Sequence, residues 1–196
     1  MDIDIVLILW FVGSYILGSI SFGDIVSGLR GVDIRSVGTG NPGAANVYRE
    51  IGPVYGIAVF FIDVTKGLIV TIPIYVFGSI WMAVLGMLGV MVGHILPAPW
   101  RSSVGTGMAL VMGSTLGLLP FGSLIVAVPT VAIMKVSKNA GYTGAFFFIS
   151  ASVVGWFLHG NVISSIAVLV AAISILVKSL IQYGNFNLLV RLRPRP

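Results

Sequence analysis

Residues 3–22 read IDIVLILWFVGSYILGSISF, an apolar run with one charged side chain and about the length that an α-helix needs to cross a bilayer. The start of the chain, Met1-Asp2-Ile3-Asp4, has no basic cluster, and no small-residue cleavage site accompanies the run. It therefore does not match a secretory signal. We expect it to be retained as the first membrane span.

Six further apolar segments follow this run, at about 53–77, 79–97, 104–119, 121–135, 143–160 and 162–181. Glycine and proline separate them, as at Gly78 and Pro120, because these residues interrupt helices. The pattern predicts an all-α integral membrane protein, a seven-transmembrane-helix bundle that forms one domain over residues 1–196.

The composition favours the same class of protein. Hydrophobic residues make up 57% of the 196 residues and charged residues only 9%, which is more apolar surface than a water-soluble domain of this size can bury. The chain has no cysteine and two histidines, so it lacks the thiolates of a metal or disulfide site and a histidine-rich cluster. We predict neither a metal ion nor a cofactor.

The distribution of charge predicts an orientation in the membrane. The net charge of +5 suits an anionic membrane surface better than a nucleic acid. Seven spans put the two termini on opposite sides, and cations concentrate on the cytoplasmic side. With the amino terminus outside, the cytoplasmic side receives Arg30, Arg35, Arg49, Arg101, Lys135, Lys138, Arg191, Arg193 and Arg195. We predict this orientation, with a cytoplasmic carboxyl terminus, in the plasma membrane.

The connection between the first two spans contains the sequence VGTGNPGAANVYR at 37–49. Glycines let successive backbone N–H groups converge on an anion, and asparagine side chains can donate hydrogen bonds or brace the loop. Arg49 can bind phosphate through the planar fork of its guanidinium. The stretch predicts a phosphate site at the membrane surface, although an ordinary glycine-rich connection is an alternative reading of so short a motif.

Several segments in order resemble the bacterial acyl-phosphate:glycerol-3-phosphate acyltransferases, the PlsY family. They are residues 17–23, 31–35, 37–49, 63–67 and 93–97. The resemblance implies a seven-helix membrane enzyme of phospholipid synthesis whose active site faces the cytoplasm. It implies transfer of a fatty acyl group from acyl phosphate to the 1-hydroxyl of sn-glycerol 3-phosphate, which yields lysophosphatidic acid. The implied partners are these two substrates and membrane lipids, with no coenzyme A and no nucleic acid. The sequence does not indicate an oligomeric state.

The same resemblance assigns roles to individual residues. It implies a catalytic set of Thr39, Arg49 and Asn185. We predict a substrate-binding set of Gly38, Gly40, Asn41, Gly43, Asn46, Arg35, Arg101, Lys66 and His94.

Three positions depart from the family's pattern. Thr39 replaces a serine and keeps its hydroxyl. Val104 stands at the lysine of a Gly-Gly-Lys-Gly turn, and Gln182 at the histidine of a His-x-x-Asn motif. Loss of an ammonium from a phosphate site removes an interaction worth roughly 1.5–3 kcal/mol. Arg101 or Lys138 could compensate for that loss.

These departures leave alternative functions open. A noncatalytic or altered-specificity lipid-binding relative would explain the degenerate second and third motifs. A small transporter has less support, because the polar loop lies between spans and not within a broken helix at the midplane.

Residues inside the spans also have two readings. Asp63 and Lys66, three apart, can pair on one helix face or contact substrate. His94 can form a structural hydrogen bond at the end of its helix, or it can act in catalysis. The glycine pairs Gly89/Gly93 and Gly113/Gly117 have the four-residue spacing that lets helices approach closely, and we predict that they serve packing.

Overall fold

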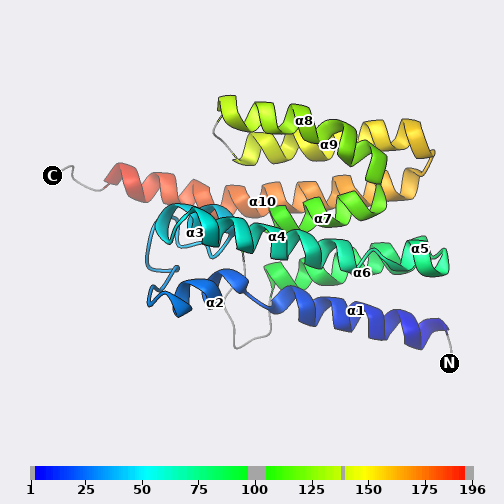
Figure 1. The fold of residues 1–196 in the computed structure, drawn as a ribbon, viewed down its shortest axis with the longest axis horizontal. Helices are drawn as coiled ribbons and strands as arrows, with labels where there is room; N and C mark the ends of the chain where they lie inside the picture. The colour runs from blue at the N-terminus through cyan, green and yellow to red at the C-terminus, as the bar shows by residue number, and fades with distance from the viewer. Residues whose placement is uncertain (1–2, 97–104, 138–139, 193–196) are drawn as a thin grey trace.

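The structure, a computed structural model, describes residues 3–96, 105–137 and 140–192. Within these ranges the regular structure is helical and contains no strand, which confirms the all-α prediction. The helices are α1 (Ile3–Ser19), α2 (Phe22–Leu29), α3 (Ala44–Glu50), α4 (Pro53–Ile69), α5 (Pro73–Phe77), α6 (Ile80–Ile95), α7 (Met108–Leu118), α8 (Pro120–Ser137), α9 (Ala140–His159) and α10 (Val162–Leu192). Figure 1 shows the longer helices running side by side along one axis.

Four helical segments of the described chain are long and apolar enough to cross a membrane: Asp4–Leu29, Pro53–Phe77, Pro120–Ser137 and Gly141–Leu158. Three shorter apolar helices accompany them, at Ile80–Ile95, Met108–Leu118 and Val162–Lys178. Each of the seven apolar segments predicted from the sequence overlaps one of these. The chain is therefore a multi-pass membrane protein, and the number of helices that cross the bilayer stays a prediction.

Helix boundaries follow local signals in the sequence. The Ser79 hydroxyl caps α6 by accepting a hydrogen bond from Met82 N at 3.2 Å, while Gly78 before it adopts a left-handed conformation with φ of 66°. Pro53 and Pro73 lie in the first turns of α4 and α5, where the missing proline N–H costs no hydrogen bond.

The glycine-rich connection is shorter than the sequence indicated. The sequence predicts a single loop over residues 37–49, whereas α3 begins at Ala44 and includes Arg49. Alanine is the strongest helix former, and two alanines directly after Gly43 start this helix. Arg49 therefore projects from a helix and not from the loop itself.

Close helix packing depends on glycine, as predicted. A Cβ atom at Gly93 would overlap Tyr15 O of α1, and one at Gly113 would overlap Val64 O of α4. Gly89 would place its Cβ 2.6 Å from Phe11 O. These backbones touch directly, which confirms the packing role of the glycine pairs.

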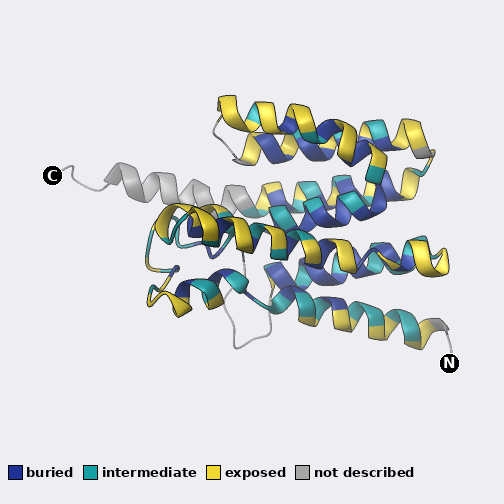
Figure 2. Ribbon diagram, in the orientation of Figure 1, coloured by how far each residue is buried: buried dark blue, intermediate teal, exposed yellow. Residues whose placement is uncertain are grey.

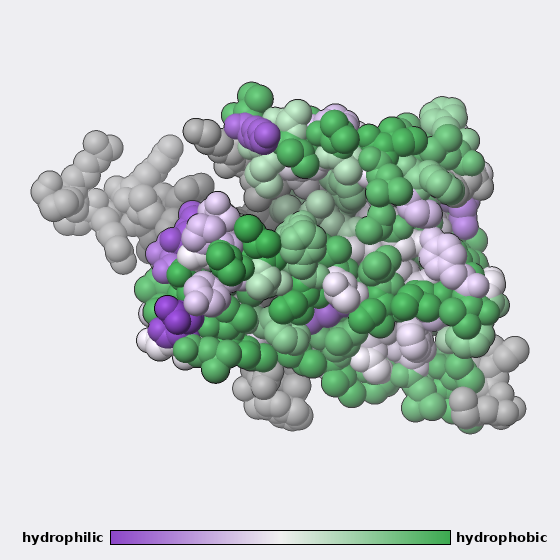
Figure 3. Space-filling model, in the orientation of Figure 1, coloured by the Kyte–Doolittle hydropathy of each residue, from purple (hydrophilic) through white to green (hydrophobic). Residues whose placement is uncertain are grey.

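Apolar side chains cover the outside of the bundle. Val54, Val128 and Phe157 are each at least 75% exposed, and Figure 2 shows exposed residues along the outer helix faces. The surface in Figure 3 is correspondingly hydrophobic along the helices, with a marked hydrophilic patch at the end formed by α2 and α3. Such a surface suits lipid contact along the helices and water at that end.

The chain turns at two ends of the bundle. One end of the bundle, on the left of Figure 1, contains the loop before α3, the end of α8 and the start of α9, and α6 ends and α7 begins toward the same side. α1 begins at the other end. Arg30, Arg35 and Arg49 belong to the first of these ends, which we call the basic end. The side of the membrane that it faces stays a prediction.

Candidate active site

The glycine loop, residues 31–43, leads from α2 to α3 at the basic end. Gly38 and Gly40 have φ of 57° and 68°, a region that other residues rarely adopt. Asn46 of α3 holds the loop in place, because its Oδ1 accepts from Thr39 N at 3.0 Å and its Nδ2 donates to Val37 O at 3.1 Å. Asn46 was predicted to bind substrate, and its contacts here are those of a loop brace.

Thr39 contributes a hydroxyl group within this loop. Its Oγ1 is buried and has no hydrogen-bond partner in the part of the chain that the structure describes. A buried polar atom normally has a partner, so this oxygen is suited to contact a ligand.

Arg49 and Glu50 occupy the last turn of α3. Both side chains are exposed, and Arg49 makes no hydrogen bond or ion pair with another described residue. Glu50 lies over the loop, with Oε1 2.6 Å from the position of a Cβ on Gly38. Arg49 is three residues after Asn46, and helix positions three apart are neighbours. Arg49 therefore lies on the same side of α3 as Asn46, the residue that holds the loop.

Arg35 lies in the loop, and its side chain is anchored to α2. Its Nη2 lies 2.6 Å from Asp24 Oδ2, and both side chains are about one-third exposed. Its backbone N donates to Asp33 Oδ1 at 3.0 Å. The guanidinium is thus held in a fixed place at the basic end, within reach of solvent.

His94, at the end of α6, is the centre of contacts between three segments. Its side chain is 2% exposed, and Nδ1 has no hydrogen-bond partner among the described residues. A Cβ on Gly105 would lie 2.9 Å from His94 Nε2 and 3.5 Å from Asn41 Oδ1. Only glycine at 105 allows the glycine loop, α6 and the segment before α7 to meet here.

Lys66 of α4 has partners inside the protein. Its Nζ lies 3.1 Å from Asp63 Oδ1 and donates to Ile20 O at 2.6 Å, and it lies 4.7 Å from the centre of the Phe22 ring. The pairing with Asp63 confirms one of the two readings of these residues. Direct contact between Lys66 and substrate stays a prediction.

Lys178 of α10 reaches the same region from another helix. Its Nζ donates a hydrogen bond to Gly105 O, so the ammonium lies at the turn that also touches His94 and Asn41. Lys66 and Lys178 are both within electrostatic range of His94, and Arg35 is within range of Lys178. We call Arg35, Lys66 and Lys178 the cationic cluster, and the buried His94 imidazole lies beside it.

The cationic cluster is suited to an anion. Asp24 and Asp63 offset the charges of Arg35 and Lys66, and Lys178 adds a further positive charge, so an anionic ligand is favoured here. The buried Thr39 hydroxyl adds a hydrogen-bonding group that suits phosphate oxygens.

Other predicted site residues have less structural detail. Arg101 and Lys138, and Val104 with them, lie outside the described residues. Asn185 lies on α10, and its side chain is not described. Gly40 and Gly43 belong to the loop, with Gly43 directly preceding α3.

Comparison with known proteins places this arrangement in a family. Residues 8–186 match the family of glycerol-3-phosphate acyltransferases. The chain belongs to this family. Curated relatives of that name include proteins from Aquifex aeolicus, 40% identical over 55% of this chain, and Geobacter metallireducens, 41% identical over 60% of it. The matches span 57% and 61% of those two proteins.

Two solved structures resemble the whole fold of this family member. One is described as PlsY (YgiH), an integral membrane glycerol 3-phosphate acyltransferase, in its glycerol 3-phosphate form, with a TM-score of 0.81 and 30% identity. The other is the lysophosphatidic acid form, with a TM-score of 0.78 and 29% identity. Both alignments cover 96% of this chain and 94% of the other.

The sequence did not identify two residues of this acyltransferase-family site. The sequence assigns no role to Lys178, although a lysine in an apolar helix is a functional candidate. Nothing in the sequence indicated that it contacts Gly105, 73 positions away. No pattern in the sequence indicated that Glu50 lies near the site, because its position over Gly38 depends on the formation of α3.

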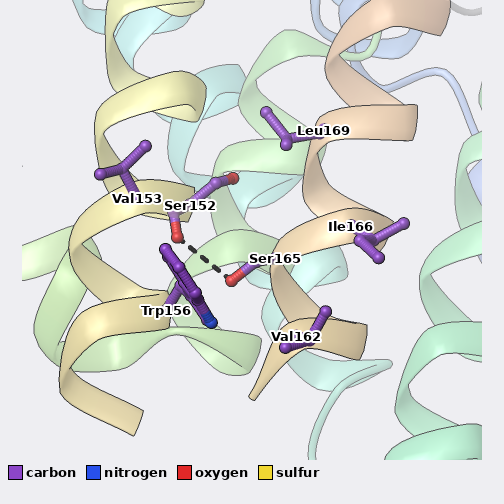
Figure 4. A pocket seen from close by; sticks show the side chains of 7 residues that line it. All are labelled: Ser152, Val153, Trp156, Val162, Ser165, Ile166 and Leu169. Carbon is purple, nitrogen blue, oxygen red and sulfur yellow. Dashed lines mark hydrogen bonds between the residues drawn. The ribbon is translucent and has the colours of Figure 1, made fainter. Parts of the chain in front are cut away.

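A cavity of about 250 Å³ lies elsewhere, between α9 and α10. Figure 4 shows its lining, with Trp156 on one side and Ile166 on the other, and the hydrogen bond from Ser165 Oγ to Ser152 O. Ser165 precedes Lys178 by 13 positions, about 20 Å along the helix. This apolar cavity is therefore separate from the cationic cluster.

Proposed function

We propose that this chain transfers a fatty acyl group from acyl phosphate to the 1-hydroxyl of sn-glycerol 3-phosphate and so forms lysophosphatidic acid. The gathering of the cationic cluster around the glycine loop carries the proposal, because it fits a phosphate group. Membership in the acyltransferase family supports it, as do the solved relatives described as glycerol 3-phosphate and lysophosphatidic acid forms.

The proposed reaction requires little activation of the nucleophile. The 1-hydroxyl oxygen attacks the acyl carbonyl carbon, the bond from that carbon to the phosphate oxygen breaks, and inorganic phosphate leaves. The hydroxyl proton passes to a phosphate oxygen of the substrate. Because phosphate is a good leaving group, the protein contributes mainly orientation and stabilisation of charge.

We propose these roles within the site. Arg49 and the loop amides at Gly38 and Gly43 bind phosphate, while Gly40, whose N–H donates to Val37 O at 3.0 Å, shapes the loop. Thr39 and Asn185 orient the reacting groups, and Asn46 acts through the loop. Asn41, His94, Arg35, Lys66 and Arg101 complete the substrate-binding set.

The proposed setting is the plasma membrane. Seven transmembrane helices form a single domain over residues 1–196, with the amino terminus outside and the site facing the cytoplasm. A water-soluble phosphate ester then reaches the site from the cytoplasm, while the acyl donor reaches it from the bilayer. The hydrophilic basic end beside apolar helix faces supports this division.

A second candidate is a noncatalytic or altered-specificity lipid-binding relative. Val104 and Gln182 favour it, since they stand where the family has a lysine and a histidine. Such a protein would retain phosphate binding and lack turnover.

The deciding experiment supplies purified protein in detergent with acyl phosphate and glycerol 3-phosphate and measures lysophosphatidic acid. A parallel reaction with acyl coenzyme A tests the choice of donor. Product from acyl phosphate supports the enzyme. Binding of glycerol 3-phosphate without product from either donor supports the lipid-binding relative.

Arg49→Ala tests the placement of the phosphate site. Removing a charged hydrogen bond costs roughly 1.5–3 kcal/mol, so we expect affinity for glycerol 3-phosphate to fall about tenfold to a hundredfold. Arg30→Ala is the matched control, because Arg30 is exposed at the same end and lies 5.1 Å from the centre of the Tyr55 ring. Unchanged affinity in Arg49→Ala would remove Arg49 from the site.

A further inference from the structure

We propose that Lys178 is the phosphate-binding cation at the Gly105 turn and takes the place of the lysine that is absent at Val104. This inference rests on the proposed function, because it names a substrate-binding residue of that site. The ligand group that it recognises is a phosphate monoester or an acyl phosphate.

The first support is the position of the ammonium. Lys178 Nζ donates to Gly105 O, and residue 105 directly follows the position where the family has its lysine. An ammonium brought from α10 therefore occupies the neighbourhood of the missing one. Lysine acts on phosphate as a point charge, so the helix that supplies it is unimportant as long as the charge arrives at the right place.

The second support is the surrounding charge and polarity. Arg35 and His94 both lie within electrostatic range of Lys178, and Asn41 touches the same glycine. Arg35 has its own carboxylate partner, Asp24, so Lys178 adds a positive charge beyond that ion pair. A site for a doubly charged phosphate accounts for the grouping.

The third support comes from α10 itself. A helix places residues four and seven apart on one side, so positions 182 and 185 follow Lys178 along the same side of α10. These are the positions of the family's His-x-x-Asn motif. Lys178 thus extends the motif's side of the helix by one turn, toward the end of α6.

A lysine in an apolar membrane helix also carries a cost. Charged residues in such segments are unfavourable and mark functional sites by default. Lys178 is partly buried, at the carboxyl-terminal end of the apolar segment Val162–Lys178. A neutral side chain would suit this environment better if the position served packing alone.

The test compares Lys178→Gln and Lys178→Met with Lys178→Arg. Glutamine can still donate a hydrogen bond to Gly105 O but has no charge, methionine suits an apolar helix, and arginine keeps the charge. Lys135→Gln is the matched control, because Lys135 is an exposed lysine in the last turn of α8. Thermal unfolding in detergent establishes that each variant is folded.

The measurements are affinity for inorganic phosphate, affinity for glycerol 3-phosphate, and the separate values of kcat and KM. We expect both neutral variants to bind phosphate about tenfold to a hundredfold more weakly, with KM for glycerol 3-phosphate raised more than kcat is lowered. Arginine should restore most of the affinity. Lys135→Gln should match the wild type.

Wild-type affinity for phosphate in either folded neutral variant would overturn the inference, even if lysophosphatidic acid is formed. Failure of the wild type to form lysophosphatidic acid would overturn the proposed function instead, and the phosphate measurement would still decide the role of Lys178. A wild type that binds no phosphate would overturn both. Loss of affinity that arginine does not restore would assign Lys178 a structural role and overturn the inference.

Discussion

Asn46 shows how one side chain determines the shape of the glycine loop. It is 1% exposed, and besides its bonds to Thr39 N and Val37 O its Nδ2 lies 3.4 Å from Ile34 O. The amide therefore joins three points of the loop to α3. The loop's positive-φ glycines need such a brace, since glycine loses the most conformational freedom on folding.

We expect Asn46→Leu to destabilise the protein by about 1–3 kcal/mol, the usual cost of leaving buried polar groups without partners. Leucine has a similar volume but cannot replace the amide's bonds to Thr39 N and Val37 O. Thermal unfolding in detergent, with and without phosphate, measures the effect. Ala45→Leu on the exposed neighbouring position is the control. Equal unfolding temperatures for Asn46→Leu and the wild type would show that the brace is unimportant.

The site could be predicted only in part from these residues. The glycine loop, with Thr39 and Asn46, follows from a short continuous stretch of sequence, because glycines and amides are typical of anion sites. The role of Lys178 could not be predicted from that stretch, since Lys178 contacts Gly105, which is 73 positions away in the sequence. The burial of the Thr39 hydroxyl likewise depends on packing around the loop.

Among the elements, the seven apolar segments were predictable because length and hydrophobicity alone indicate membrane helices. The break between α1 and α2 was not. Ser21 accepts a hydrogen bond from Asp24 N at 3.3 Å and starts α2, so the apolar segment continues to Leu29, beyond the predicted end at residue 22. A serine cap within an apolar run gives little signal, since serine is also common inside membrane helices.

Packing between α1 and α6 gives a prediction at the level of elements. In Gly93→Ala the new Cβ would overlap Tyr15 O, and backbone atoms cannot move aside as a flexible side chain can. We expect a loss of about 1–3 kcal/mol, as for other overpacked interiors. Gly13→Ala on α1 is the matched control, because nothing lies within 4 Å of its Cβ position. The difference in unfolding temperature between the two alanine variants measures the cost, and no difference would contradict the direct backbone contact.

At the scale of the whole molecule, the arrangement of the helices determines which residues share an end. Four parts of the site are far apart in sequence: the glycine loop, His94, Gly105 and Lys178. They meet because α6 and α10 both run toward the basic end (Figure 1). A phosphate site assembled there lies beside the exposed apolar faces of the helices. Substrates from water and from lipid can thus approach the same place.

The arginines at that end predict the orientation of the molecule. The prediction can be tested with single cysteines, because the chain has none of its own. Ser36 is exposed in the glycine loop, and Phe77 is 70% exposed at the end of α5, on the opposite end of the bundle. Cations are retained on the cytoplasmic side. In a bacterial plasma membrane we therefore expect a membrane-impermeant maleimide to label Phe77→Cys in intact cells and Ser36→Cys only in inverted vesicles. Labelling of Ser36→Cys from outside would reverse the orientation, and it would put the glycine loop out of reach of a cytoplasmic phosphate ester.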